Sequence, residues 1–127
     1  MPTKRKLVAI IDDDPSVLRG LKRVLDASHF ATKVHDSGEA FLDSESASQV
    51  SCIVLDIHLS GISGIELRQR LKAMGSTIPV IFMTAHDSVA VRREAMDAGC
   101  AAYLQKPFSG HALINAIRNA TSVAERH

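Results

Sequence analysis

Short apolar runs alternate with amphipathic segments along the whole chain, and this alternation limits the folds that the chain can adopt. Three of the runs are apolar almost without interruption: residues 7–11 (LVAII), 51–55 (SCIVL) and 78–83 (IPVIFM). Runs of this kind are typical of strands that are covered on both faces, as in a parallel sheet. Residues 30–35 instead alternate, with Phe30, Thr32 and Val34 on one face, which predicts an edge strand. Residues 101–105 (AAYLQ) form the weakest strand candidate.

The segments between these runs have helical periodicity. After the first run, one apolar stripe is formed by Val17, Leu18, Leu21, Val24 and Leu25. A second helix is predicted after the sequence DSGE at 36–39, a third ends at Gly75, a fourth covers 88–98 with Gly99 as its C-cap, and a fifth covers 110–124. This alternation predicts an α/β fold of the doubly wound (βα)5 type, with a five-stranded parallel sheet. The length of 127 residues fits a single domain, which we assign to residues 1–127.

Composition narrows the classes of function. Lys and Arg number 15 against 14 for Asp and Glu, and the resulting net charge of +1 argues against nucleic acid or an anionic membrane as the main partner. No apolar stretch approaches the length of a membrane span and no signal peptide is visible, so we expect a cytoplasmic location. Cys52 and Cys100 have no His or Cys at metal-ligand spacing, and we interpret both as reduced packing residues.

Polar residues follow the predicted strands at their carboxyl ends: Asp12 and Asp13, Asp56, Thr84 and Lys106. In a parallel sheet these ends lie at one edge, and ligands bind there, where the strand order reverses. We therefore expect the five side chains to meet in one crevice. Asp14 differs from its two neighbours because it precedes Pro15 and the first helical stripe, which predicts an N-cap followed by proline at the first helical position.

The chemistry of this set points to phosphoryl transfer. Adjacent carboxylates raise one another's pKa unless a cation lies among them, and Mg²⁺ is the usual partner of a few carboxylates and a phosphoryl group. Lys106 offers a compact positive charge for a phosphoryl oxygen, and the Thr84 hydroxyl can donate to another. The combination predicts a reaction in which one carboxylate is the nucleophile.

The sequence resembles a response-regulator receiver domain of two-component signal transduction, from about Lys6 to Thr121. The resemblance is carried by IIDDDP, IVLDIHLSGISG, VIFMTAHD and YLQKPF, which occur in this order. The pattern is most similar to the receivers of FixJ-like transcriptional regulators. It implies a CheY-like, flavodoxin-like three-layer sandwich with strand order 2-1-3-4-5.

The resemblance also implies the role of each acidic residue. Asp56 would be the phosphoacceptor, with a sensor histidine kinase as donor and Mg²⁺ as cofactor. Asp13 and Asp56 would bind the metal directly, Asp12 mostly through water, and His58 through its backbone carbonyl. A domain of this kind is not an enzyme for external substrates, because it catalyses only its own phosphorylation and dephosphorylation.

Further implied roles concern the response to phosphorylation. Lys106 would pair with the phosphoryl group and form a cis peptide with Pro107. Thr84 would follow the phosphoryl group and Tyr103 would change rotamer with it. The face built from the fourth helix, fifth strand and fifth helix would then bind an output partner, or a second copy of the domain as a phosphorylation-dependent homodimer.

Two loop features lie close to the predicted acidic crevice. Ser60 stands where the family commonly has proline, so the loop after the third strand is expected to be less constrained, although Gly61 and Gly64 still permit its turns. His58 and His86 lie two residues beyond Asp56 and Thr84. The resemblance implies that they tune the lifetime of the phosphoryl group, and the alternative is that they are ordinary exposed loop residues.

Two other functions compete with this interpretation. A haloacid-dehalogenase-type phosphatase needs a second acid two residues after the nucleophile, where this chain has His58. A pseudo-receiver would act as a constitutive interaction module without phosphorylation, but such domains have usually lost an acid or the lysine. No helix-turn-helix follows residue 124, so we expect either a stand-alone receiver or the front of a longer regulator with its own DNA-binding domain.

Overall fold

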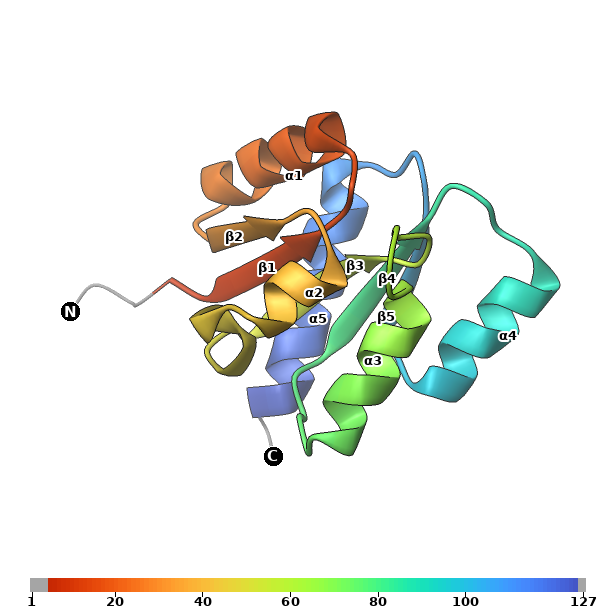
Figure 1. Cartoon of the computed structure of the whole chain (residues 1–127). Coiled ribbons are helices and arrows are strands. Elements are labelled where there is room, and N and C mark those ends of the chain that lie inside the picture. Colours follow the sequence, from red (N-terminus) through yellow and green to blue (C-terminus); the bar gives the residue numbers. More distant parts are fainter. Residues whose placement is uncertain (1–4, 126–127) are drawn as a thin grey trace.

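The computed structural model describes residues 5–125, which form a parallel sheet between two helical layers (Figure 1). The strands are β1 (Leu7–Ile11), β2 (Ala31–His35), β3 (Cys52–Asp56), β4 (Val80–Thr84) and β5 (Ala102–Gln105). The helices are α1 (Pro15–Ala27), α2 (Gly38–Leu42), α3 (Gly64–Ala73), α4 (Val89–Ala98) and α5 (Gly110–Glu125), with a 3₁₀ turn at Glu45–Ser48 that the sequence analysis did not predict. All strand pairs are parallel and the order is β2-β1-β3-β4-β5, which confirms the predicted fold.

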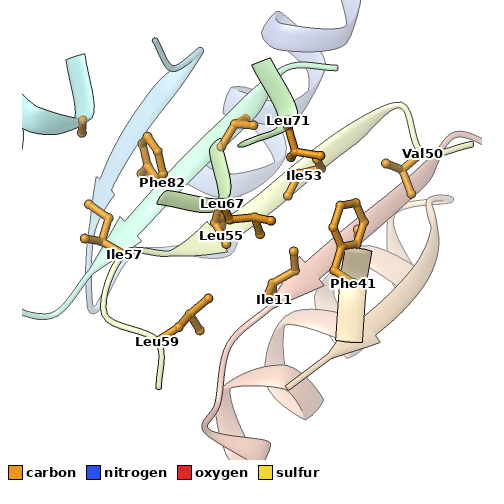
Figure 2. Close-up of a cluster of buried hydrophobic side chains, with 13 residues drawn as sticks. Ile11, Phe41, Val50, Ile53, Leu55, Ile57, Leu59, Leu67, Leu71 and Phe82 are labelled. Atoms are coloured by element: carbon orange, nitrogen blue, oxygen red, sulfur yellow. The ribbon is translucent and has the colours of Figure 1, made fainter. Parts of the chain in front are cut away.

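Alternation along the strands divides the interior into two cores. Ala9 and Ile11 point to one face and Val8 and Ile10 to the other, because successive side chains of a strand lie on opposite faces. Figure 2 shows the first core, where strand residues meet Phe41, Leu67 and Leu71 from the helices that cover this face. The second core lies beneath α1 and α5 and includes Leu18, Leu25, Leu113 and Ile117. Among the described residues, no helix is both long and apolar enough to cross a bilayer.

β2 is an edge strand, as its alternating sequence predicted. The face assigned to it is only partly buried: Phe30 is in the second core, but Val34 remains 41% exposed. Between them, Thr32 hydrogen-bonds Lys22 and Asp26 of α1. Phe30 and Val34 differ in burial because β2 lies at the edge of the sheet, where neighbouring elements cover only part of its apolar face.

The helix ends largely follow the sequence signals. The Asp14 side chain caps α1 by accepting a hydrogen bond from the Ser16 N–H at 2.9 Å, and Pro15 is the first helical residue, as predicted. Gly99 ends α4 with φ +87°. α3 ends at Ala73 with Met74 as its C-cap, slightly before the predicted end at Gly75, which adopts φ +84° just outside the helix.

Gly64 positions α3 against the end of β3. Its N–H donates to the Ile57 carbonyl at 2.9 Å. A Cβ at this position would collide with the Asp56 carbonyl oxygen and lie 2.9 Å from the Ile57 Cα. The loop from 57 to 63 is therefore closed tightly beside Asp56 by a residue without a side chain.

Gly64→Ala should lower the free energy of unfolding by about 2 kcal/mol, because the added methyl meets backbone that cannot move aside cheaply. Gly20→Ala is the matched control, since a Cβ at this exposed position in α1 has no neighbour within 4 Å. It should stabilise the protein by about 0.5–1 kcal/mol through the higher helix propensity of alanine. Urea unfolding of both variants checks the pair, and a shift in the same direction would contradict the argument.

Candidate functional site

The three acidic residues predicted to converge do so at the carboxyl edge of the sheet. Asp12 and Asp13 follow β1, Asp56 ends β3, and these two strands are direct neighbours. Each residue offers one carboxylate oxygen, and the three oxygens lie within 4.8 Å of one another. The site therefore lies at the point where the strand order reverses, between β1 and β3.

Lys106 brings a positive charge into this cluster from β5, on the far side of β4. Its Nζ lies 2.6 Å from Asp12 Oδ2 and 3.6 Å from Asp56 Oδ2. The predicted cis peptide between Lys106 and Pro107 is present. Asp12 is only 1% exposed, and a buried carboxylate is costly unless a cation pairs with it. Lys106 thus compensates two of the three acids at once.

Burial, hydrogen bonds and neighbouring charges together shift the pKa values of Asp56 and Lys106. Burial raises the pKa of Asp56, and the charges of Asp12 and Asp13 raise it further, while the His58 N–H and Lys106 oppose the change without cancelling it. Burial by itself would lower the pKa of Lys106, but its hydrogen bond to Asp12 and the charge of Asp56 outweigh that effect and raise it. The lysine therefore remains an ammonium group beside the carboxylates.

Asp13 is the exposed member of the cluster and is held from the loop after β3. Its Oδ2 accepts hydrogen bonds from the Ser60 N–H at 3.3 Å and from the Ser60 hydroxyl at 3.1 Å. Two residues further, the Ile62 N–H donates to Glu39 Oε2 of α2 at 3.3 Å. The sequence predicted a less constrained loop here because proline is missing. In the structure, two carboxylates anchor it instead.

Thr84 is fully buried at the end of β4, and its hydroxyl accepts a hydrogen bond from the His86 N–H at 3.0 Å. Asp87 follows His86 in the loop between β4 and α4 and connects this loop to the predicted switch residue Tyr103. The Tyr103 hydroxyl donates to Asp87 Oδ1 at 2.7 Å, and Arg92 Nη2 donates to Asp87 Oδ2 at 2.8 Å. Arg92 also lies over the Tyr103 ring, 5.3 Å from its centroid. Burial and the hydrogen bond to Asp87 raise the pKa of Tyr103 to about 12.

The sequence analysis did not single out Asp87. It stands in the run VIFMTAHD, three residues after Thr84, where a loop acid is unremarkable by itself. Its two partners come from β5 and α4, so only the packing of these elements identifies it as a link between them.

His58 and His86 are exposed loop residues, and the structure brings them together. Their ring centroids are 5.5 Å apart in an edge-to-face arrangement. The His58 N–H donates to Asp56 Oδ1 at 3.1 Å, which fixes one oxygen of that carboxylate. The metal-ligand role of the His58 carbonyl stays a prediction.

The donor set suits a hard divalent cation. All three acidic side chains offer oxygen only, and Mg²⁺ prefers a small number of carboxylates together with water and phosphoryl oxygens. Both Asp12 oxygens already accept hydrogen bonds, from the Asp14 N–H at 2.9 Å and from Lys106. In Asp13 and in Asp56, by contrast, only one carboxylate oxygen accepts a hydrogen bond from the described residues, which leaves the other oxygen for a metal or a phosphoryl group.

Comparison with known proteins identifies one family. Residues 8–118 match the response regulator receiver domain. The chain is 43% identical over 111 residues to the transcriptional regulatory protein FixJ of Azorhizobium caulinodans, covering 87% of this chain and 53% of that protein. It is 36% identical to FixJ of Bradyrhizobium diazoefficiens, covering 97% of this chain and 60% of the relative. The structure of FixJ-N superposes with a TM-score of 0.86 at 34% identity, covering 94% of this chain and 96% of that one. The chain thus spans between half and two thirds of the length of these two regulators.

Lys106→Met should lower the free energy of unfolding by about 2 kcal/mol in metal-free buffer, because it leaves Asp12 buried without its cation. Adding Mg²⁺ should then raise the melting temperature of the variant more than that of the parent, since the metal replaces the missing charge. Lys22→Met is the matched control, because Lys22 pairs with Asp26 on the solvent-exposed side of α1. It should change little. Equal losses in the two variants would show that burial of Asp12 is not what makes Lys106 important.

Proposed function

This chain belongs to the response regulator receiver domain family, and from that premise we propose that it is a phosphorylation-controlled switch whose phosphoacceptor is Asp56. One observation carries the proposal: Lys106 Nζ lies between Asp12 and Asp56 at the edge where the three carboxylates meet. A carboxylate nucleophile beside a fixed ammonium group is suited to take up a phosphoryl group. The match to the response regulator receiver domain, together with relatives that are transcriptional regulatory proteins, supports a sensor histidine kinase as donor and the cytoplasm as the place of action.

The reaction transfers a phosphoryl group from a histidine of the kinase. A carboxylate oxygen of Asp56 attacks phosphorus, a P–O bond forms, the P–N bond breaks, and the departing imidazole takes a proton. We assign Oδ2 as the attacking oxygen, because Oδ1 accepts from the His58 N–H and Oδ2 faces Lys106. Lys106 then pairs with a phosphoryl oxygen and stabilises the charge that develops there.

The proposed metal ligands are Asp13, Asp56 and the His58 carbonyl, with Asp12 contacting the ion through water. The two hydrogen bonds already made by Asp12 support its place outside the direct ligand set. When bound, Mg²⁺ would neutralise the acidic cluster and offset the charge of the phosphoryl oxygens.

The response to phosphorylation would travel through the loop from 85 to 88. A Thr84 hydroxyl that turns to the phosphoryl group no longer accepts from the His86 N–H, so this loop must rearrange. Asp87 belongs to the same loop and holds both Tyr103 and Arg92. Its movement would release Tyr103 and shift an equilibrium between two arrangements of the surface.

The surface that changes is the output face, which we define as Arg92, Arg93, Met96, Tyr103, Gln105 and His111. Met96 is 53% exposed on α4, and neighbouring Val89 is 81% exposed, so the α4 side of this face offers apolar area to a partner. We propose a second receiver as that partner, in a phosphorylation-dependent homodimer. The two FixJ relatives are transcriptional regulatory proteins of which this chain covers only 53% and 60%, which supports a DNA-binding output in a longer parent protein.

Asp56→Asn should abolish phosphorylation by acetyl phosphate with Mg²⁺, because an amide does not attack phosphorus as a carboxylate does. Intact-mass spectrometry should find one phosphoryl group on the parent protein and none on the variant. Asp14→Asn is the matched control, since this carboxylate caps α1 and is expected to take no part in the reaction. A parent protein that gains no phosphoryl group would favour a constitutive binding module instead.

Beryllofluoride with Mg²⁺, which stands in for the phosphoryl group, should change the fluorescence of Tyr103 and raise the sedimentation mass toward a dimer. The chain has one tyrosine and no tryptophan, so the emission reports on Tyr103 alone. Emission should increase when the hydroxyl leaves the Asp87 carboxylate, because a carboxylate acceptor quenches tyrosine. Asp87→Ala should give the brighter emission without beryllofluoride, and Asp56→Asn should not respond. Unchanged emission and mass in the parent would contradict the proposed switch.

A further inference from the structure

Among the residues that the structure describes, Ser60 is the one that donates hydrogen bonds to the Asp13 carboxylate. Both of its donors, the backbone N–H and the hydroxyl, reach the same oxygen, Oδ2, at 3.3 and 3.1 Å. The two residues are 47 positions apart and belong to different loops, after β1 and after β3. This contact therefore joins the two loops that border the acidic cluster.

Asp13 depends on this contact more than the other two acids depend on any one neighbour. Asp12 is paired with Lys106 and also accepts from the Asp14 N–H. Asp56 accepts from the His58 N–H and has Lys106 at 3.6 Å. Asp13 is exposed and lies next to two like charges, which favour rotation of its side chain out toward water. Hydrogen bonds from Ser60 oppose that rotation.

The loop that carries Ser60 is itself fixed. Gly61 adopts φ +79°, and a Cβ there would collide with the Glu39 carboxylate. Glu39 in turn accepts from the Ile62 N–H. The loop that carries Ser60 thus has anchors besides Asp13: Glu39 of α2 on one side and the buried Leu59 side chain on the other. A donor held from outside the cluster can orient a flexible carboxylate before a metal arrives.

We propose that Ser60 is a positioning residue for the Mg²⁺ site: its two donors keep Asp13 beside Asp56 in the metal-free protein and so strengthen metal binding. This inference rests on the proposed function, since it concerns the same site. Oδ1 of Asp13 makes no hydrogen bond with the described residues, so the metal and Ser60 need not compete for one oxygen.

The test measures Mg²⁺ affinity by isothermal titration calorimetry, without any phosphoryl donor. Ser60→Ala removes the hydroxyl and should weaken binding about fivefold, which corresponds to about 1 kcal/mol. Ser60→Thr keeps the hydroxyl and should bind within about twofold of the parent. Tighter binding by Ser60→Ala would mean that Ser60 competes with the metal, and unchanged binding would mean that it has no role; either result overturns the inference.

Glu39→Ala is the control for loosening of the loop in general. It removes the anchor at Ile62 but leaves both Ser60 donors and should bind within about twofold of the parent. A loss equal to that of Ser60→Ala would assign the effect to the loop and overturn the specific role of Ser60.

A double-mutant cycle supplies a readout that needs no metal. In buffer with chelator, Ser60→Ala should lower the melting temperature by about 2 °C in the parent and leave it unchanged in an Asp13→Ala background. Asp13→Ala also separates the two proposals. If it binds Mg²⁺ as well as the parent does, the proposed metal site is wrong. If it loses binding while Ser60→Ala does not, only the role of Ser60 is wrong.

Discussion

Three carboxylates at the ends of two neighbouring strands repel one another, and the strand order and the ion pairs of this structure compensate that repulsion. The sheet brings Asp12, Asp13 and Asp56 together because β1 and β3 are paired in parallel and end at the same edge. Burial of Asp12 would then be unfavourable without a cation. Lys106, directly after β5, supplies the charge, and the strand order β1-β3-β4-β5 brings this residue to the same edge of the sheet as Asp12. Fold stability and site chemistry therefore share one ion-pair network.

The strand order also places one residue between the acidic cluster and the output face. Thr84 lies at the end of β4, between the strand that carries Asp56 and the strand that carries Tyr103. Its hydroxyl is bonded within the loop that contains Asp87, and Asp87 holds both an aromatic side chain of β5 and a cation of α4. A change of charge at Asp56 that moves Thr84, as we propose, would thus have a short route to α4 through the loop that contains Asp87. The family supplies the expectation of a switch, whereas the Asp87 contacts specify how this chain would build it.

The sequence predicted the elements well, because burial on both faces leaves a continuous apolar run in a strand and burial on one face leaves a periodic apolar pattern in a helix. Apolar runs located the three central strands, and Asp14 with Pro15 located the start of α1. Convergence of the acids followed from the parallel topology alone. The contacts of Ser60 with Asp13, of Asp87 with Tyr103 and of His58 with His86 were not predicted. Each joins two segments through loop conformations, and a loop residue makes such contacts without any periodic signal. The absence of proline at Ser60 is visible in the sequence, but its consequence depends on where the serine donors point.

The three acids differ in what compensates their charge, and this difference separates their proposed roles. Asp12 is buried and bound to the ammonium group of Lys106, so its charge is compensated by this ion pair, which holds Lys106 in place. Asp56 is buried but only partly compensated, and burial together with its acidic neighbours raises its pKa, which leaves an electron-rich oxygen facing the lysine. Asp13 is exposed and meets neutral donors of Ser60, so it keeps the charge that is most available to an incoming cation. A gradient from a buried, paired acid to an exposed, hydrogen-bonded one would thus suit three chemically identical groups to the separate tasks that we propose: anchoring the lysine, attacking phosphorus and attracting the metal.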